Sequence, residues 1–247
     1  FFLFHVQLEH SAVLAGCEAA LVMSLLGAVS LLVFITPFLS ASTLLPFVTT
    51  IALGSILEAV ISMTFGVNVR SFPSDVETQS IEWAGIFMTP VQLLIIGSAA
   101  IIFVVLGLVM HRAPLGRAVR AISDNTAAAA SLGIRDRRVL YGVFIVSVLL
   151  AAYAGILVGY ETNIQPTMGG SYSIKSFAAM LLGGLGSIWG TILGALILGL
   201  VENLSIGLDF GGYSLPAGYK DAFAFVIILL VLLVRPQGLL GTKARSA

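Results

Sequence analysis

The sequence predicts an all-α fold, a polytopic bundle of transmembrane helices with a glycine-rich re-entrant hairpin. Hydrophobic residues make up 58% of the 247 residues and charged residues only 10%, whereas soluble domains carry about 25% charged residues. The apolar residues form several runs close to the length of about 20 residues that a helix needs to cross a bilayer. A cluster of glycines interrupts the longest of these runs.

The remaining composition excludes several classes of protein. The formal net charge is zero, so the charge balance indicates no nucleic-acid partner. Cys17 is the single cysteine of the sequence, which excludes an internal disulfide and a cysteine metal cluster. We expect Cys17 to pack as a small apolar residue in a helix. The chain starts with Phe1 and lacks a basic leader region, which predicts a truncated N-terminus.

Six apolar segments are predicted to enter the membrane, each bounded by the ends of an apolar run. Their approximate bounds are 13–37, 44–65, 91–110, 139–160, 174–203 and 221–234. The last segment stops at Arg235 and Pro236, because proline cannot continue a helix. It is short, so its helix is expected to begin about one turn earlier.

Basic residues in short loops predict the orientation, because they are retained in the cytoplasm. The loop at 112–138 carries six of the twelve Lys and Arg residues, and the C-terminal tail carries Arg235, Lys243 and Arg245. Both are therefore expected to be cytoplasmic. The loop at 66–83 is mainly acidic and the loop at 161–173 has no Lys or Arg, so both are expected outside.

This orientation requires an even number of crossings between residues 161 and 220. A re-entrant hairpin in 174–203 satisfies that requirement, with a half-helix at 174–182, a turn at mid-membrane depth and a returning segment at 188–203. The turn is Gly183-Gly184-Leu185-Gly186-Ser187, and glycine tolerates the positive φ angles of such turns. Non-helical backbone at that depth is stable when it lines a cavity. The alternative is one long helix whose glycines allow tight packing.

The basic segment 114–134, PLGRAVRAISDNTAAAASLGI, is predicted to form a short helix between two spans. Gly116 lies near its start, and Gly133 is expected to end it. Arg117, Arg120 and Asp124 are three and four residues apart, so they share one helical face. A small-faced helix anchored at both ends would fit a partner's groove and transmit a force. The alternative is a basic loop that only sets topology.

Three runs of the sequence resemble the permeases of branched-chain amino acid ABC importers. The run PLGRAVRAISDNTAAAASLGI resembles their cytoplasmic coupling segment, GGLGSIWGTILGALILGLVENL their glycine-rich penultimate segment, and YKDAFAFVIILLVLLVRPQGLLG their terminal helix and tail. The runs keep the family's order and cover about residues 90–241. The first 90 residues match only in hydropathy and in LLPFVTTIALGSILEAV. The early glycine-rich run of the family is absent, and the loop at 38–42, which the order of the spans places in the cytoplasm, lacks the family's usual arginines.

The resemblance implies a single permease domain over 1–247 that forms half of a translocation path by alternating access. Its expected partners are cytoplasmic ATP-binding subunits, a second permease subunit, an extracytoplasmic solute-binding protein and the lipid bilayer. It implies a multi-pass protein of the bacterial inner membrane, no cofactor and no enzymatic activity. The residues implied in ATPase coupling are Gly116, Arg117, Arg120, Ala121, Asp124 and Gly133. Those implied in the pathway hairpin are Gly183, Gly184, Gly186, Ser187 and Gly190.

Glu58 lies midway along the second predicted span. A carboxylate at that depth costs about 3 kcal/mol on insertion scales, so it is expected to face the bundle interior. It either lines the path or braces two helices, and we favour the bracing role. Glu18 and Glu202 lie nearer the ends of apolar runs and are expected to be interfacial or packing residues. His5, His10 and His111 show no metal-binding spacing, and the sequence has no phosphate-binding GxxxxGK[ST] loop.

The predicted function is uptake of branched-chain or related amino acids. Three alternatives remain open, and one of them is a membrane scaffold that transports nothing. The same type of permease could carry urea, short amides or another small polar solute, which sequence patterns separate poorly. A channel or ion-coupled carrier without an ATPase is another class, but it would usually place several ionisable residues at mid-membrane.

Overall fold

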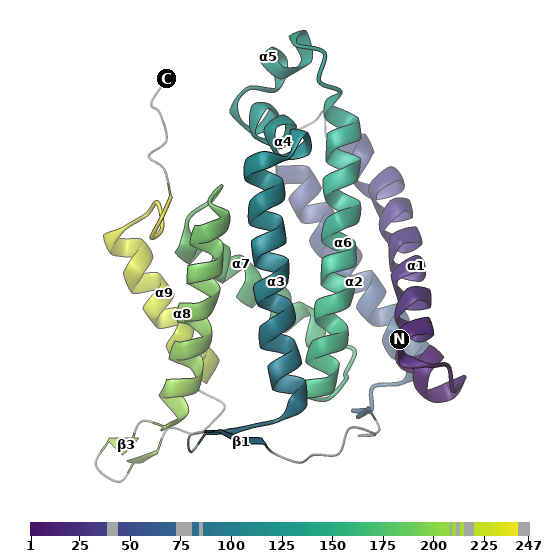
Figure 1. The fold of residues 1–247 in the computed structure, drawn as a ribbon, viewed down its shortest axis with the longest axis vertical. Coiled ribbons are helices and arrows are strands. Elements are labelled where there is room, and N and C mark those ends of the chain that lie inside the picture. The colour runs from purple at the N-terminus through teal and green to yellow at the C-terminus, as the bar shows by residue number, and fades with distance from the viewer. Residues whose placement is uncertain are drawn as a thin grey trace. The chain divides into compact units, whose positions relative to one another are not determined.

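The computed structural model describes residues 1–38, 44–72, 81–83, 86–207, 209–210, 213–214 and 220–241. Its chain divides into two compact units, Phe1–Gly169 and Gly170–Ala247, and each is described by itself. Most of the described residues are helical (Figure 1), as the high apolar content predicts. Parts of two predicted features, the loop at 38–42 and the C-terminal tail with Lys243 and Arg245, lie outside the described residues.

The first unit contains four long apolar helical segments, Ala12–Phe38, Val48–Phe65, Pro90–Arg112 and Asp136–Glu161, each long and apolar enough to cross a membrane. They confirm the first four predicted spans. The elements of this unit are η1 (Leu3–Gln7), α1 (Ala12–Ser30), η2 (Leu31–Ile35), η3 (Thr36–Phe38), α2 (Leu44–Phe65), β1 (Ile81–Trp83), β2 (Ile86–Met88), α3 (Pro90–Arg112), α4 (Pro114–Asp124), α5 (Thr126–Ser131) and α6 (Asp136–Glu161).

Helix α6 lies between α1 and α3 in the first unit (Figure 1). Gly27 of α1 allows close packing against the Val148 side chain of α6. At the start of α3, the Thr89 hydroxyl accepts a hydrogen bond from the Gln92 amide at 3.2 Å and Gln92 reaches back to the Thr89 amide. This capping box satisfies amides that helix geometry leaves unpaired. Gln92 also donates to Glu161 at 2.9 Å, so α3 begins where α6 ends.

The two loops predicted to lie outside meet at this same end of the unit. The Arg70 and Ile164 backbones exchange hydrogen bonds of 2.9 and 2.7 Å. The Phe72 ring stacks on Tyr160 with 4.5 Å between the ring centroids. The end of α3 and the start of α6, with α4 and α5 between them, lie at the other end (Figure 1). The structure therefore separates the two predicted outer loops from the basic segment.

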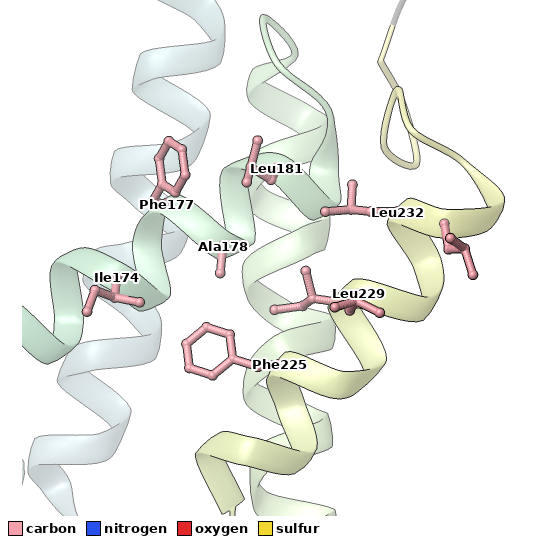
Figure 2. Close-up of a pocket in the computed structure, with 9 residues that line it drawn as sticks. Ile174, Phe177, Ala178, Leu181, Phe225, Leu229 and Leu232 are labelled. Atoms are coloured by element: carbon pink, nitrogen blue, oxygen red, sulfur yellow. The ribbon is translucent and has the colours of Figure 1, made fainter. Parts of the chain in front are cut away.

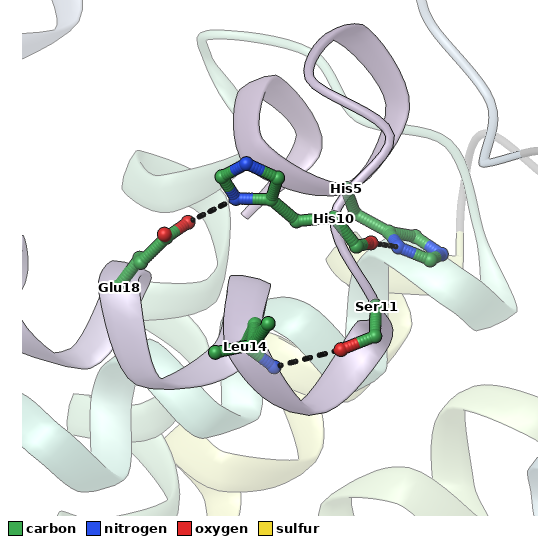
Figure 3. A network of polar contacts seen from close by, with 5 residues as sticks. All are labelled: His5, His10, Ser11, Leu14 and Glu18. Atoms are coloured by element: carbon green, nitrogen blue, oxygen red, sulfur yellow. Dashed lines mark hydrogen bonds and ion pairs between the residues drawn. The ribbon is translucent and has the colours of Figure 1, made fainter.

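The histidines of the N-terminal segment make structural contacts with the start of α1. The His10 ring pairs with the Glu18 carboxylate at 2.9 Å, and the His5 ring donates to the His10 carbonyl at 2.9 Å (Figure 3). The Ser11 hydroxyl caps α1 by accepting from the Leu14 amide. Within the described residues, no three His, Cys, Asp or Glu side chains come together as metal ligands would.

The second unit is built from α7 (Met168–Gly183), α8 (Ile188–Gly207) and α9 (Lys220–Val234), with the short strands β3 (Asp209–Phe210) and β4 (Tyr213–Ser214). α7 and α8 are bent by 119° at the break between them, so the alternative of one long helix is wrong. α9 ends at Val234, directly before Arg235 and Pro236, as predicted. The core of the unit joins Leu182, Leu198 and Ile228 from the three helices.

Candidate functional site

The basic segment predicted to be cytoplasmic forms two helices, α4 and α5, instead of the single helix predicted. Asn125 separates them, with extended backbone angles of φ −159° and ψ 105°. Its side chain accepts a hydrogen bond from the Ala128 amide at 3.0 Å and so caps α5. Asparagine competes for backbone hydrogen bonds and favours caps over helix interiors, which explains the break.

Gly133 ends α5 as predicted, in the left-handed conformation with φ +81°. Its amide donates to the Ala130 carbonyl at 2.9 Å, and the next amide, of Ile134, donates to the Ala129 carbonyl at 3.1 Å. These two bonds are those of a Schellman motif, in which glycine is the favoured residue. The segment therefore has a defined start, break and end.

Gly116 and Arg120 hold α4 against the end of α3. Gly116 is buried, and any side chain there would collide with the Met110 carbonyl. The Arg120 guanidinium donates to that same carbonyl. Arg117 and Asp124 are exposed and Ala121 is half-buried. The predicted coupling residues therefore divide into a pair that fixes α4 in place and others that remain accessible to a partner.

Two exposed leucines in this segment were not predicted as site residues. Leu115 is 63% exposed at the start of α4, and Leu132 is 81% exposed at the end of α5. An exposed leucine has no special meaning in a lipid-facing helix, but here both flank arginines in a segment predicted to face water. Their position beside charged residues is the feature of the sequence that could have identified these two leucines as site residues.

The glycines predicted to form the hairpin turn come together at the break between α7 and α8. Gly184 has φ +106° and Gly186 has φ +85°, so both adopt a conformation that other residues rarely take. The Ser187 hydroxyl accepts from the Gly190 amide at 3.0 Å, which caps α8. Gly183 and Gly190 face each other so closely that a Cβ on either would strike the other's backbone carbonyl.

The arms of this hairpin differ from the prediction in length and in surroundings. α7 begins at Met168, six residues before the predicted start of the half-helix at 174. The turn also binds the chain segment after α9, because the Leu239 and Leu240 amides donate to the Leu182 and Gly183 carbonyls at 2.9 Å each. These are terminal carbonyls of α7, which the helix itself leaves unpaired.

An ion pair joins α7 to α8. Lys175 Nζ lies 3.1 Å from Glu202 Oε2, and the side chains are only 19% and 15% exposed. The sequence prediction missed this pair, since it gave Glu202 only an interfacial or packing role and gave Lys175 no role. A lysine inside an apolar run could have indicated an ion pair. Only the fold shows that its partner is Glu202, 27 residues later.

Glu58 is half-buried on α2. Its carboxylate has no hydrogen-bond or ion-pair partner in the part of the chain that the structure describes. The bracing role is therefore not visible among the described residues. The prediction that Glu58 lines the path stays a prediction.

An apolar groove of about 570 Å³ runs between α7 and α9 in the second unit (Figure 2). Ile174, Phe177 and Ala178 line one side, and Phe225 and Leu229 line the other. Because these side chains offer no hydrogen-bonding group, the groove cannot orient a polar solute. It is a surface suited to hydrocarbon.

The apolar spans and the capped turns define a polytopic helical membrane protein. The comparison with family models identifies the family within this class. A model described as the permease component of the branched-chain amino acid transport system matches residues 3–232. The chain belongs to this family of permease components, and its relatives are transport proteins of a family not known as enzymes.

Curated relatives agree with this assignment. The high-affinity branched-chain amino acid transport system permease protein BraD of Pseudomonas aeruginosa is 31% identical over 210 residues, which are 83% of this chain and 66% of that protein. The permease protein LivH of Escherichia coli is 32% identical with the same coverage. The ribose import permease protein RbsC of Bacillus subtilis is 37% identical over 53% of this chain and 42% of that protein.

The chain thus spans slightly less than two thirds of the length of BraD and LivH. No solved structure matches it. The family resemblance seen in the sequence is confirmed by these comparisons.

Proposed function

We propose that the chain is a permease subunit of an ATP-driven importer and forms half of a solute path through the bacterial inner membrane. The observation that carries the proposal is family membership over residues 3–232. On this proposal the two compact units belong to one permease domain, residues 1–247, and residues 112–138 are its cytoplasmic coupling loop. The C-terminus then lies in the cytoplasm.

Cytoplasmic ATP-binding subunits are the proposed partners of α4 and α5. The two helices are joined to the spanning helices α3 and α6 by one and four residues. Gly116 and Arg120 fix α4 against Met110 at the end of α3. A displacement of α4 would therefore also displace α3. Arg117, Asp124 and the leucines Leu115 and Leu132 supply charged and apolar contacts, the mixture typical of a protein interface.

A second permease subunit and an extracytoplasmic solute-binding protein complete the proposed importer. ATP-driven closure of the ATPases moves the coupling loops, and the two permease subunits open the path to each side in turn. Glu58 and the glycine turn at 183–190 are the proposed pathway elements, because an ionisable group within a membrane span requires a cavity or a protein neighbour and the turn joins the two arms of the hairpin. The binding protein supplies most of the solute selectivity.

Branched-chain amino acids are the proposed solutes, since BraD and LivH carry that description and match 83% of this chain. Ribose import permeases match about half of it. Urea, short amides and other small polar solutes therefore remain alternatives within the same machine. Uptake of leucine, ribose and urea by proteoliposomes that contain the complete importer distinguishes them. Uptake without ATP would instead indicate a channel or carrier.

Leu132→Asp tests the coupling role. We expect this change to weaken retention of the ATPase subunits by about tenfold or more, because burying an unpaired carboxylate costs at least the 1.4 kcal/mol that corresponds to tenfold. The measurement is the amount of ATPase that co-purifies with the tagged chain, over a series of ATPase concentrations.

Val67→Asp is the matched control. Val67 is 74% exposed and lies at the opposite end of the first unit, just after α2. We expect it to retain the ATPases at the wild-type level. Equal retention in both variants would contradict the assignment of α4 and α5 to the ATPase interface.

A further inference from the structure

Residues 235–241, called the C-terminal strap, are bound to the turn between α7 and α8. The Leu239 and Leu240 amides cap the last carbonyls of α7, as described above. The Gly238 amide donates to the Arg235 carbonyl at 2.9 Å, which folds the strap back after α9. The strap thus supplies from a distant part of the sequence the cap that a helix usually receives from the residues directly after it.

Glycines on both sides make this contact possible. Gly238 has φ +78° and Gly184 has φ +106°. A Cβ on Gly238 would lie 2.5 Å from Gly184 Cα, and a Cβ on Gly184 would lie 2.6 Å from Gly241 Cα. Such distances are too short for real side chains, so the two backbones meet directly. The conformations and the contact both require glycine.

Three observations indicate that the turn lies near one face of a bilayer. α8 has 20 residues, which at 1.5 Å per residue is about 30 Å, the thickness of the hydrocarbon core. Trp189, 48% exposed, lies beside the turn, and tryptophan is enriched where hydrocarbon meets water. Arg235 begins the strap and is exposed, a residue that does not remain in hydrocarbon without cost.

We infer that the C-terminal strap clamps the turn between α7 and α8 at the cytoplasmic face of the membrane, and that the turn and the end of α9 move together. This differs from a turn at mid-membrane depth. The assignment of the turn to the cytoplasmic side rests on the orientation given in the proposed function. The clamp itself rests on contacts inside the second unit. A hairpin clamped there would close or open the inner end of the path only when α9 moves.

Cysteine labelling tests the depth of the turn. In a Cys17→Ser background, Leu185→Cys places a thiol at the turn, where Leu185 is 62% exposed, and Leu204→Cys places one near the other end of α8, where Leu204 is 64% exposed. We expect a membrane-impermeant maleimide to label Leu185→Cys only in inside-out vesicles and Leu204→Cys only in right-side-out vesicles. Protection of Leu185→Cys in both preparations, or its labelling from the outer side, would overturn the inference.

Hydrogen exchange tests the clamp. Gly238→Ala should detach the strap and speed exchange of the Leu239 and Leu240 amides by about tenfold or more, since both lose their acceptors. Leu240→Pro removes one of the two donors at an exposed position and should speed exchange at Leu239. The control is Gly199→Ala in α8, where an added Cβ meets nothing within 4 Å.

Unchanged exchange in both strap variants would refute the clamp. The exchange measurement uses the purified chain and does not depend on any ATPase. Failure of the ATPases to co-purify would therefore count against the proposed importer but not against the clamp. Unchanged hydrogen exchange in the strap variants would count against the clamp but not against the importer.

Discussion

Three small residues decide how closely α7 and α8 approach. Added Cβ atoms on Gly183 and Gly190 would strike the opposite backbone, and one on Gly194 would strike the Ala179 carbonyl. Small residues at helix interfaces are the usual means of association in lipid, where apolar side chains gain nothing by leaving the hydrocarbon. The obstacle is backbone rather than a flexible side chain, so the helices would have to separate to accept a methyl group.

Gly190→Ala is therefore expected to destabilise the second unit by about 3 kcal/mol, at the upper end of the usual cost of overpacking. The measurement is the apparent Tm of the detergent-purified chain. Gly199→Ala, on the same helix with open space around it, should be neutral or raise stability by up to about 1 kcal/mol, because alanine is the better helix former. Equal shifts in Tm would show that the glycines are not in contact.

At the scale of elements, the Lys175–Glu202 ion pair holds the arms of the hairpin at a point away from the turn. The pair is largely shielded from water, so each charge helps to compensate the other. Removing one partner takes that compensation from a charge that stays shielded from water, whereas removing both removes the two charges together. The two cases make different predictions for stability.

Lys175→Met alone is expected to destabilise the chain by about 3–5 kcal/mol, and the double variant Lys175→Met with Glu202→Leu by much less. Thermal unfolding of the two single variants and the double variant completes a double-mutant cycle. Exchange of the two residues, Lys175→Glu with Glu202→Lys, should restore most of the stability. Additive losses in the double variant would mean that the charges do not interact.

At the scale of the whole molecule, orientation in the membrane is the property on which the proposed function depends. α4 and α5 lie at one end of the first unit, and the Arg70–Ile164 bridge lies at the other. The positive-inside rule places the basic end in the cytoplasm. Leu132→Cys and Val67→Cys, each in a Cys17→Ser background, probe these two ends.

We expect an impermeant maleimide to label Leu132→Cys only from the cytoplasmic side and Val67→Cys only from the outer side. Purified inside-out and right-side-out vesicles provide the two preparations. Labelling of Leu132→Cys from outside would remove the basis for the coupling role of residues 112–138.

Sequence reasoning located the spanning helices because apolar run length follows directly from bilayer thickness. α2 has the predicted bounds 44–65, and α3 and α6 each extend the predicted spans by a few residues. The stop at Gly133 and the break at Gly184–Ser187 were also predictable, since glycine chemistry is local. The break at Asn125 was missed because an asparagine inside an alanine-rich run can be read as helical.

The amino-acid sequence by itself determined the class of protein, the four long spans, the glycine turn and the family, because each depends on local composition and order. Only the tertiary structure decided which residues that are far apart in the sequence come into contact. Backbone geometry and packing produce three such contacts. They are the strap on the turn, the Lys175–Glu202 pair, and the contacts of Gly116 and Arg120 with Met110. Neither composition nor periodicity encodes such pairings, because they arise only when the helices are placed against one another.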